Sequence, residues 1–220
     1  MRVSVVIPAR NEEAFLPHCL ERIAHQTLKP LEVIVVDSAS TDRTAQVAKD
    51  HGARVIRLDE PGVGRARHAG FQAAAGEVIA STDADALVPR DWLERLVSPF
   101  GDPAVVGSFG TVSPQGRPLS GRIYALFQRV NWRLGIPLFC GPNFAVRREA
   151  FLKVGGFLGP QGPYQEAEDV RLGLKLRRVG RIIYLPYLSV EVSPRSLSPG
   201  YVLHHIWLYI GTCWLRREDV

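Results

Sequence analysis

Two aspartates, Asp83 and Asp85, end an apolar stretch that reads EVIASTDADAL over residues 77–87. On an extended backbone, residues two apart project to the same side. Neighbouring carboxylates resist ionising together unless a cation offsets them, and Mg²⁺ or Mn²⁺ accepts such hard oxygen ligands while keeping positions for phosphate oxygens. The pair therefore predicts a divalent-metal site that binds phosphate. The alternative is an Asx-rich turn after a strand, in which Asp85 only caps a loop.

Other carboxylates also stand where chemistry is possible. Asp37 ends the apolar run VIVVD, where it can accept hydrogen bonds from a base or ribose, or instead cap the helix expected after SAST. Glu166, Glu168 and Asp169 precede or open an expected helix. A helix N-terminus favours an ionised carboxylate, as a general base requires, but acidic residues are also ordinary first-turn stabilisers. Both readings of each group stay open at this point.

The segment GVGRARHAG, residues 62–70, resembles a dinucleotide-binding fingerprint. However, Arg67 occupies the position of the third glycine, and the segment does not follow the first expected strand. A dinucleotide site of the Rossmann type is therefore not predicted. Arg65 and Arg67 are instead candidates to face a diphosphate, with solvated helix charges as the alternative.

These residues belong to a predicted α/β fold with a mainly parallel central sheet flanked by helices. The runs VSVVIP and LEVIVVD are β-branched and continuous, which is typical of strands buried on both faces of a parallel sheet. Strands and helices alternate through the first half, and ligands of such sheets bind at the carboxyl ends of the strands. The expected strands lie at 3–8, 31–37, 53–59 and 104–112, with another at the start of 77–87, and the expected helices at 40–52, 64–76, 90–100, 121–134 and 168–180. A helix is also expected between the first two strands, where Leu16, Leu20, Ile23 and Ala24 recur at helical spacing, and a short strand and helix are expected within 142–157.

Composition sets broader limits. A chain of 220 residues with 46% hydrophobic residues predicts one folded domain, and its net charge of +5 fits an anionic partner such as a nucleotide, a phospholipid surface or nucleic acid. Cys19, Cys140 and Cys213 have no CxxC spacing, so neither a zinc knuckle nor a redox pair is predicted, and a reducing, cytoplasmic compartment fits best. The first apolar run is too short for a signal-peptide core.

Taken in order, IPARNEE, VVDSASTD, DADAL, GPNFAVRREAFLKVGGF and EAEDVRLGLKLRRVG resemble the motifs of family 2 glycosyltransferases of the GT-A fold. The resemblance covers roughly residues 1–190. It implies a Rossmann-like GT-A domain over residues 1–198, with a nucleotide-binding half at 1–88 and an acceptor-binding half at 89–198. An apolar or amphipathic helix is expected at 199–220.

The resemblance also implies roles for single residues. The loop after the first strand would hold the nucleotide, Asp37 its base, and Arg67 the phosphates, although His68 replaces the asparagine that commonly follows that arginine. Gly141, Asn143 and Glu168 would line the sugar and acceptor pocket. The remaining implied contacts are Pro8, Ala9, Arg10 and Glu12 to the donor, Asp83 to ribose and metal, Asp85 as the direct metal ligand, and Asp169 as the base.

The implied reaction is inverting transfer of a single sugar by one displacement, with a Mn²⁺ or Mg²⁺ cofactor. A UDP-sugar is the favoured donor, a GDP-sugar is possible, the acceptor is a saccharide or a lipid-linked molecule, and nucleic acid is not a partner. Two features depart from the family. Ser193 and Arg195 stand where many relatives carry a metal-binding histidine, and the QxxRW motif of processive synthases is absent. His204 and His205 come later, which leaves the third protein ligand open.

The C-terminal segment, residues 201–217, is apolar and aromatic and ends in arginines. It is shorter than a bilayer span and contains two histidines, so we expect it to pack on the domain or on a second subunit, or to lie at the inner face of the membrane. Two alternative functions remain: an inactive nucleotide-sugar binding protein, and a nucleotidyltransferase. The latter should carry a glycine-rich, lysine-containing loop after the first strand, which PARNEE is not.

Overall fold

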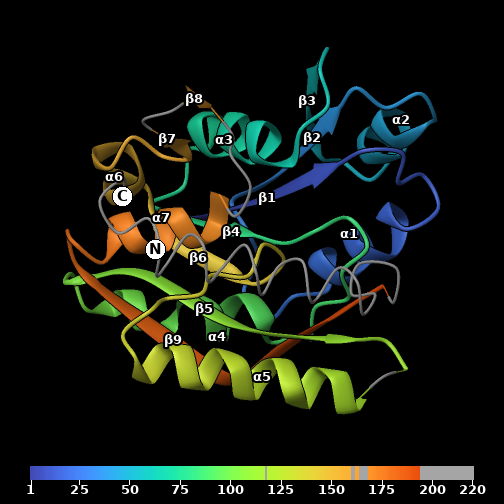
Figure 1. Cartoon of the computed structure of the whole chain (residues 1–220). Coiled ribbons are helices and arrows are strands. Elements are labelled where there is room, and N and C mark those ends of the chain that lie inside the picture. Colours follow the sequence, from blue (N-terminus) through green and yellow to red (C-terminus); the bar gives the residue numbers. More distant parts are fainter. Residues whose placement is uncertain (117, 160–161, 164–167, 194–220) are drawn as a thin grey trace.

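The structure is a computed structural model, and it describes residues 1–116, 118–159, 162–163 and 168–193. Its centre is a seven-stranded sheet of order β3-β2-β1-β4-β6-β5-β9, with helices on both faces (Figure 1). Strand β6 runs antiparallel to its neighbours β4 and β5, and the other pairings are parallel. The α/β fold with a mainly parallel sheet is confirmed.

The first half of the chain alternates strand and helix as expected. Its four strands pair in parallel, so their carboxyl ends meet at one edge of the sheet. The elements are β1 (Val3–Ala9), α1 (Leu16–Ala24), β2 (Glu32–Ser38), α2 (Thr44–Asp50), β3 (Arg54–Leu58), α3 (Val63–Ala73) and β4 (Val78–Ser81).

The second half completes the sheet and covers it. Strand β5 pairs along most of its length with β9, and the short β7 and β8 form a separate two-stranded sheet. The elements are α4 (Trp92–Val97), the 3₁₀ helix η1 (Ser98–Gly101), β5 (Val105–Pro114), α5 (Pro118–Arg133), β6 (Phe144–Arg147), α6 (Arg148–Lys153), β7 (Leu158–Gly159), β8 (Gly162–Pro163), α7 (Glu168–Leu176) and β9 (Arg181–Val192). None of the helices in the described ranges is long and apolar enough to cross a membrane.

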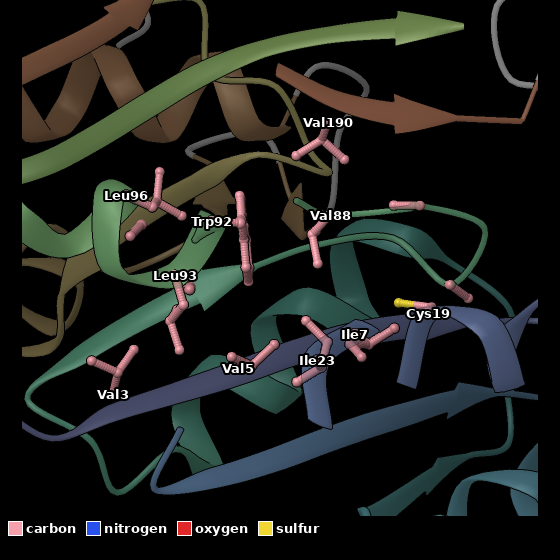
Figure 2. Close-up of a cluster of buried hydrophobic side chains, with 14 of the residues drawn as sticks. Val3, Val5, Ile7, Cys19, Ile23, Val88, Trp92, Leu93, Leu96 and Val190 are labelled. Atoms are coloured by element: carbon pink, nitrogen blue, oxygen red, sulfur yellow. The ribbon is translucent and has the colours of Figure 1, made fainter. Parts of the chain in front are cut away.

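Two hydrophobic cores fill the two faces of the sheet, because alternate residues of each strand point to opposite sides. Val5 and Ile7 of β1 pack with Trp92 of α4 in one core (Figure 2), whereas Val6 packs with Phe71 of α3 in the other. Helices α1, α2 and α4 thus cover one face, and α3, α6 and α7 cover the other. Burying a side chain of this size stabilises the fold by roughly 2 kcal/mol.

Helix α3 lies unusually close to β1 and β2. A Cβ atom at Gly70 would lie 2.4 Å from a methyl of Val6 and 2.9 Å from a methyl of Val36, so only glycine permits this approach. The close packing fixes the position of the whole helix. It therefore fixes Arg67, one turn before Gly70, relative to the carboxyl ends of the strands.

Two local predictions are corrected by the structure. The helix expected from Ser40 begins at Thr44, because the hydroxyls before it hold a neighbouring loop instead of capping the helix. The DADA segment is not extended, since β4 ends at Ser81 and the carbonyl of Asp83 accepts a hydrogen bond from the Ala86 N–H at 3.1 Å. Asp83 and Asp85 therefore stand on a turn directly after the strand.

Candidate active site

A cavity of about 530 Å³ opens at the carboxyl ends of β1, β2 and β4 and at the start of α3. Six residues predicted to contact the donor or metal line it: Pro8, Ala9, Arg10, Glu12, Asp83 and Asp85. Five further lining residues were not singled out by the sequence: Ser38, Gly62, Val63, Ala66 and Ala84. The parallel strands explain the location, since β1, β2 and β4 all end at this edge.

The loop after β1 is held by the segment after β2. The Asn11 N–H donates to the Ser40 hydroxyl at 3.0 Å, and the Glu12 N–H donates to the Thr44 hydroxyl at 2.8 Å. Asn11 has a positive φ of 54°, a left-handed conformation that asparagine tolerates better than most residues. These bonds fix the cavity wall formed by Arg10 and Glu12.

Asp37 is fully buried and is not among the residues that line the cavity. One carboxylate oxygen accepts a hydrogen bond from the Ser40 N–H at 3.1 Å, and the other lies 3.8 Å from Nε of Arg57. Asp37 thus holds the turn after β2 but does not cap α2, whose N-cap is Arg43, and its contact with the base stays a prediction. The next residue, Ser38, points the other way along the strand and lines the cavity.

Arg67 joins the two halves of the site. Its side chain is only 5% exposed, and its guanidinium donates to Asp83 at 2.6 Å and to Glu168. Burial alone would lower the pKa of Arg67, but the carboxylates around it, Asp83 first, raise that pKa instead. One buried cation therefore offsets carboxylates from the β4 turn and from the first turn of α7, which are 85 residues apart in sequence.

Gly141 makes room for this arginine. A Cβ atom at position 141 would lie 2.2 Å from Nη2 of Arg67, so any side chain there would displace the guanidinium. The Gly141 N–H also donates to Oδ2 of Asp169 at 2.9 Å. The glycine predicted to line the sugar and acceptor pocket therefore packs against the buried charges.

Asp169 is buried, with 8% of its surface exposed. Its second carboxylate oxygen, Oδ1, accepts a hydrogen bond from the Val170 N–H at 2.8 Å. Burial raises the pKa of Asp169 to about 7 and the Glu168 carboxylate adds to the rise, whereas Arg67 and the two backbone donors oppose it. A carboxylate with a pKa near neutrality can take up and release a proton at physiological pH.

Asn143 lies in the core rather than at the cavity. Its Oδ1 accepts a hydrogen bond from Nε1 of Trp92 at 2.9 Å, and its Nδ2 donates to the carbonyls of Thr111 at 2.8 Å and Leu188 at 2.9 Å. The side chain is fully buried. It ties α4, β5 and β9 together beneath the site, and this position corrects the expectation that it faces the sugar.

Asn143→Ala is expected to lower the free energy of unfolding by about 3 kcal/mol, because it strands the Trp92 donor and two buried carbonyls. Urea unfolding followed by fluorescence measures this. Gln46→Ala, which removes a side-chain bond to Asp50 on an exposed face, is the control and should change the value by less than about 0.5 kcal/mol. A loss at position 143 no larger than that of the control contradicts the structural role.

The cavity wall supplies some, but not all, of the ligands that a divalent cation requires. Asp83 and Asp85 both line it and supply hard oxygen atoms, although one oxygen of Asp83 binds Arg67. Within the described ranges, no group of three His, Cys, Asp or Glu residues could hold a metal. An ion here would therefore take its remaining ligands from phosphate and water, as Mg²⁺ commonly does.

Several predicted features lie outside the described residues. They are Glu166, Arg195, His204 and His205, and the segments 199–220 and 201–217. Ser193 is described and is buried at the end of β9.

The glycosyl transferase family 2 profile matches residues 4–155. This chain belongs to that family. The glycosyltransferase is 36% identical over 163 residues to the uncharacterized glycosyltransferase Rv0539 of Mycobacterium tuberculosis, which covers 70% of this chain and 71% of the relative. It is 33% identical over 135 residues to the 4,4'-diaponeurosporenoate glycosyltransferase of Staphylococcus aureus, which covers 58% of this chain and 35% of that protein.

Solved structures agree with the family assignment. A mannosyltransferase from Pyrobaculum calidifontis, in complex with GDP-Man and Mn²⁺, superposes with a TM-score of 0.71 at 30% identity. The match covers 94% of this glycosyltransferase but only 59% of the mannosyltransferase. S. aureus TarS in complex with UDP has a TM-score of 0.70 at 20% identity, covers 93% and 63% of the two chains, and shares the fold. The expected GT-A fold is confirmed.

Proposed function

We propose that this glycosyltransferase transfers a single sugar, with inversion, from a nucleoside-diphosphate sugar to an acceptor hydroxyl. The observation that carries the proposal is the bridge from Asp83 through Arg67 to Glu168, which brings the cavity wall next to the buried Asp169. A UDP-sugar is our first choice of donor, on the family resemblance. A GDP-sugar is the second, because the mannosyltransferase at 30% identity binds GDP-Man.

The cavity is where we place the donor. It is built from residues 8–85, which lie within the proposed nucleotide-binding half at 1–88, whereas Gly141, Glu168 and Asp169 belong to the proposed acceptor-binding half at 89–198. The base and ribose would lie against the β1 loop and Ser38, and the diphosphate beside the turn that carries Asp83 and Asp85. A divalent cation held by these aspartates would supply positive charge to the departing diphosphate.

Asp169 is our candidate for the base. Two backbone N–H groups fix the orientation of its carboxylate, and a pKa near 7 suits a group that must be ionised before transfer and protonated after it. In the proposed step the acceptor oxygen bonds to the anomeric carbon as the bond to the diphosphate oxygen breaks. The acceptor proton moves to Asp169, and the nucleoside diphosphate leaves with the bonding electrons.

A thermal-shift panel of nucleoside diphosphates and nucleotide sugars tests the donor site. We expect a UDP or GDP compound with Mn²⁺ to raise the melting temperature by roughly 5–10 °C near a hundredfold excess over Kd, because ligands stabilise the state that binds them. Asp85→Asn should lose most of this shift, whereas Asp50→Asn, an exposed change on α2, should keep it.

Two results would count against this donor site. The first is a panel in which no nucleotide stabilises the wild-type protein. The second is an Asp85→Asn variant whose shift equals that of Asp50→Asn. Either result leaves the roles of Asp169 and Arg67 to be tested separately by the variants described below.

A further inference from the structure

The outward face of α5 is apolar. Leu119, Ile123, Leu126 and Val130 of this helix and Leu134 just beyond it recur at intervals of three or four residues, and each is at least 48% exposed. That spacing places them on one side of a helix, and they form what we call the α5 stripe. A contiguous exposed apolar surface of this kind marks an interaction site more often than it marks an ordinary protein surface.

Contacts on the inward face of α5 hold the helix so that the α5 stripe points away from the sheet. Gln128 is fully buried and donates to the carbonyls of Gly110 and Leu138 at 3.2 and 3.3 Å. A Cβ atom at Gly121 would lie 2.3 Å from the Ser113 hydroxyl, so the helix packs closely on β5 there. Figure 1 shows α5 along the outside of the molecule, against β5 and β9. The helix is therefore held by one face and presents the α5 stripe on the opposite one.

Three arginines border the α5 stripe: Arg122, Arg129 and Arg133. At 100° per residue they lie together along one side of the apolar face. The helix contains no aspartate or glutamate. Tyr187 of β9 extends the surface, since its side chain is 81% exposed and lies 5.5 Å from the guanidinium of Arg129. The surface thus combines exposed apolar side chains, an aromatic residue and positive charge without compensating acid on the helix.

We propose that the α5 stripe and its arginines bind the surface of a membrane that contains anionic phospholipid. An amphipathic helix with arginines beside its apolar face lies in the plane of the interface, with the apolar side chains among the acyl chains and the cations at the phosphates. Tyrosine is enriched at that depth. The proposal assigns a membrane contact to α5 and does not depend on the donor or on the catalytic role of Asp169.

Charge complementarity favours this occupant over two others. A second copy docked through the same stripe would bring the arginines of two helices together with no carboxylate on either helix. The chain after residue 193 carries Arg195, Arg216 and Arg217 against Glu218 and Asp219, so it offers no excess of negative charge either. An anionic lipid surface satisfies both the apolar and the cationic parts of the α5 face.

The same helix connects this surface to the site. Phe127 of α5 is half-buried and packs against a small cluster formed by Ile136, Leu138 and Val170, the last of which follows Asp169 in α7. A membrane bound at the α5 stripe would therefore lie on the outer side of a helix that contacts the same hydrophobic cluster as α7. This arrangement gives the enzyme a fixed orientation on the surface.

Co-sedimentation of the full chain with vesicles tests the proposal. We expect binding to vesicles of phosphatidylcholine and phosphatidylglycerol, weaker binding to phosphatidylcholine alone, and release from the mixed vesicles at high salt. Ile123→Glu with Leu126→Glu should reduce binding at least about tenfold. Arg122→Gln with Arg133→Gln should weaken binding to the mixed vesicles roughly twenty-five-fold, at about fivefold for each charge. Leu31→Glu, an exposed apolar residue away from α5, is the matched control.

A labelling experiment distinguishes the membrane from two other molecules that could cover the α5 stripe, the rest of the chain and a second copy. Leu126→Cys in a Cys213→Ser background should react quickly with a soluble maleimide in the monomer and slowly when anionic vesicles are present. Slow labelling of the monomer without vesicles shows that the chain itself covers the stripe, and a dimer that Ile123→Glu dissociates shows a second copy. Either result overturns the proposal, as does vesicle binding that the α5 variants leave at the level of Leu31→Glu.

Discussion

Asp169→Asn is expected to lower the release of nucleoside diphosphate by at least about a hundredfold, with donor binding kept within a few fold. The amide cannot accept the acceptor proton, although the change leaves the cavity lined by Asp83 and Asp85 intact. Release is measured with a panel of saccharide and lipid-linked acceptors, and with water as acceptor. Some loss of stability is expected, since an amide NH₂ must face the Gly141 or the Val170 N–H. Assays are therefore run well below the melting temperature of the variant.

Glu149→Gln is the matched control for this variant. Glu149 also stands in the first turn of a helix, α6, but it is exposed. An acid that merely stabilises a helix start contributes less than about 1 kcal/mol, and its loss should not affect turnover. Turnover in Asp169→Asn above a tenth of the wild-type value would falsify the base assignment. Release of pyrophosphate by the wild type would indicate a nucleotidyltransferase, and donor binding without any turnover would indicate an inactive binding protein.

Arg67→Met is expected to lower the free energy of unfolding by about 3 kcal/mol at pH 8, because it leaves buried carboxylates without their cation. Glu168 and Asp169 are both about 8% exposed, and Arg67 is the cation that opposes the rise in the pKa of Asp169. Denaturant unfolding at several pH values measures the loss. Donor turnover should fall as well, since Arg67 holds Asp83 and Glu168 in place.

The pH dependence gives the Arg67 prediction a second readout. When folding raises the pKa of an acid, that acid lowers the free energy of unfolding by its full amount at pH values above the folded-state pKa. It has no effect at pH values below the unfolded-state pKa. For Asp169 that window runs from 3.8 to about 7 in the wild type, and loss of Arg67 moves its upper end higher. The deficit of Arg67→Met should thus be largest above pH 7 and smallest near pH 4. Arg65→Met, in an exposed pair with Glu60, is the control and should cost less than about 1 kcal/mol at every pH. A pH-independent deficit equal to that of the control would contradict the bridging role.

Local patterns predicted the scaffold because the forces that shape it are local in sequence. Continuous β-branched runs predicted the positions of the buried parallel strands. The carboxyl ends of those strands predicted the position of the cavity that Asp83 and Asp85 line. The second helix begins at Thr44, four residues after the start that the sequence pattern predicts. The reason is that the Ser40 hydroxyl accepts a hydrogen bond from the loop after β1 and does not cap the helix. Hydrogen-bonding residues near an element are ambiguous until their partners are known.

The parts of the site that were not foreseen depend on contacts between distant segments. Arg67 and Glu168 are 101 residues apart, and nothing near either residue reveals their pairing. The sequence around Asn143 is typical of a polar turn, yet this side chain is buried and forms hydrogen bonds to α4, β5 and β9. The position of Ser38 at the cavity could have been predicted from the sequence, because alternate residues of β2 point to opposite sides and Ser38 follows the buried Asp37. Sequence thus indicated the kind of site, whereas packing determined which side chains face the cavity.

The most direct test of the central claim, that a buried Asp169 beside the donor cavity acts as the base, is the pH profile of kcat/KM for nucleoside diphosphate release, because kcat/KM reports the pKa values of the free enzyme. The account predicts an ascending limb with an apparent pKa near 7, since only the ionised carboxylate can take the acceptor proton. A rate that stays level from about pH 5 to pH 8 would mean that no group with the pKa of Asp169 governs transfer, and it would contradict the account.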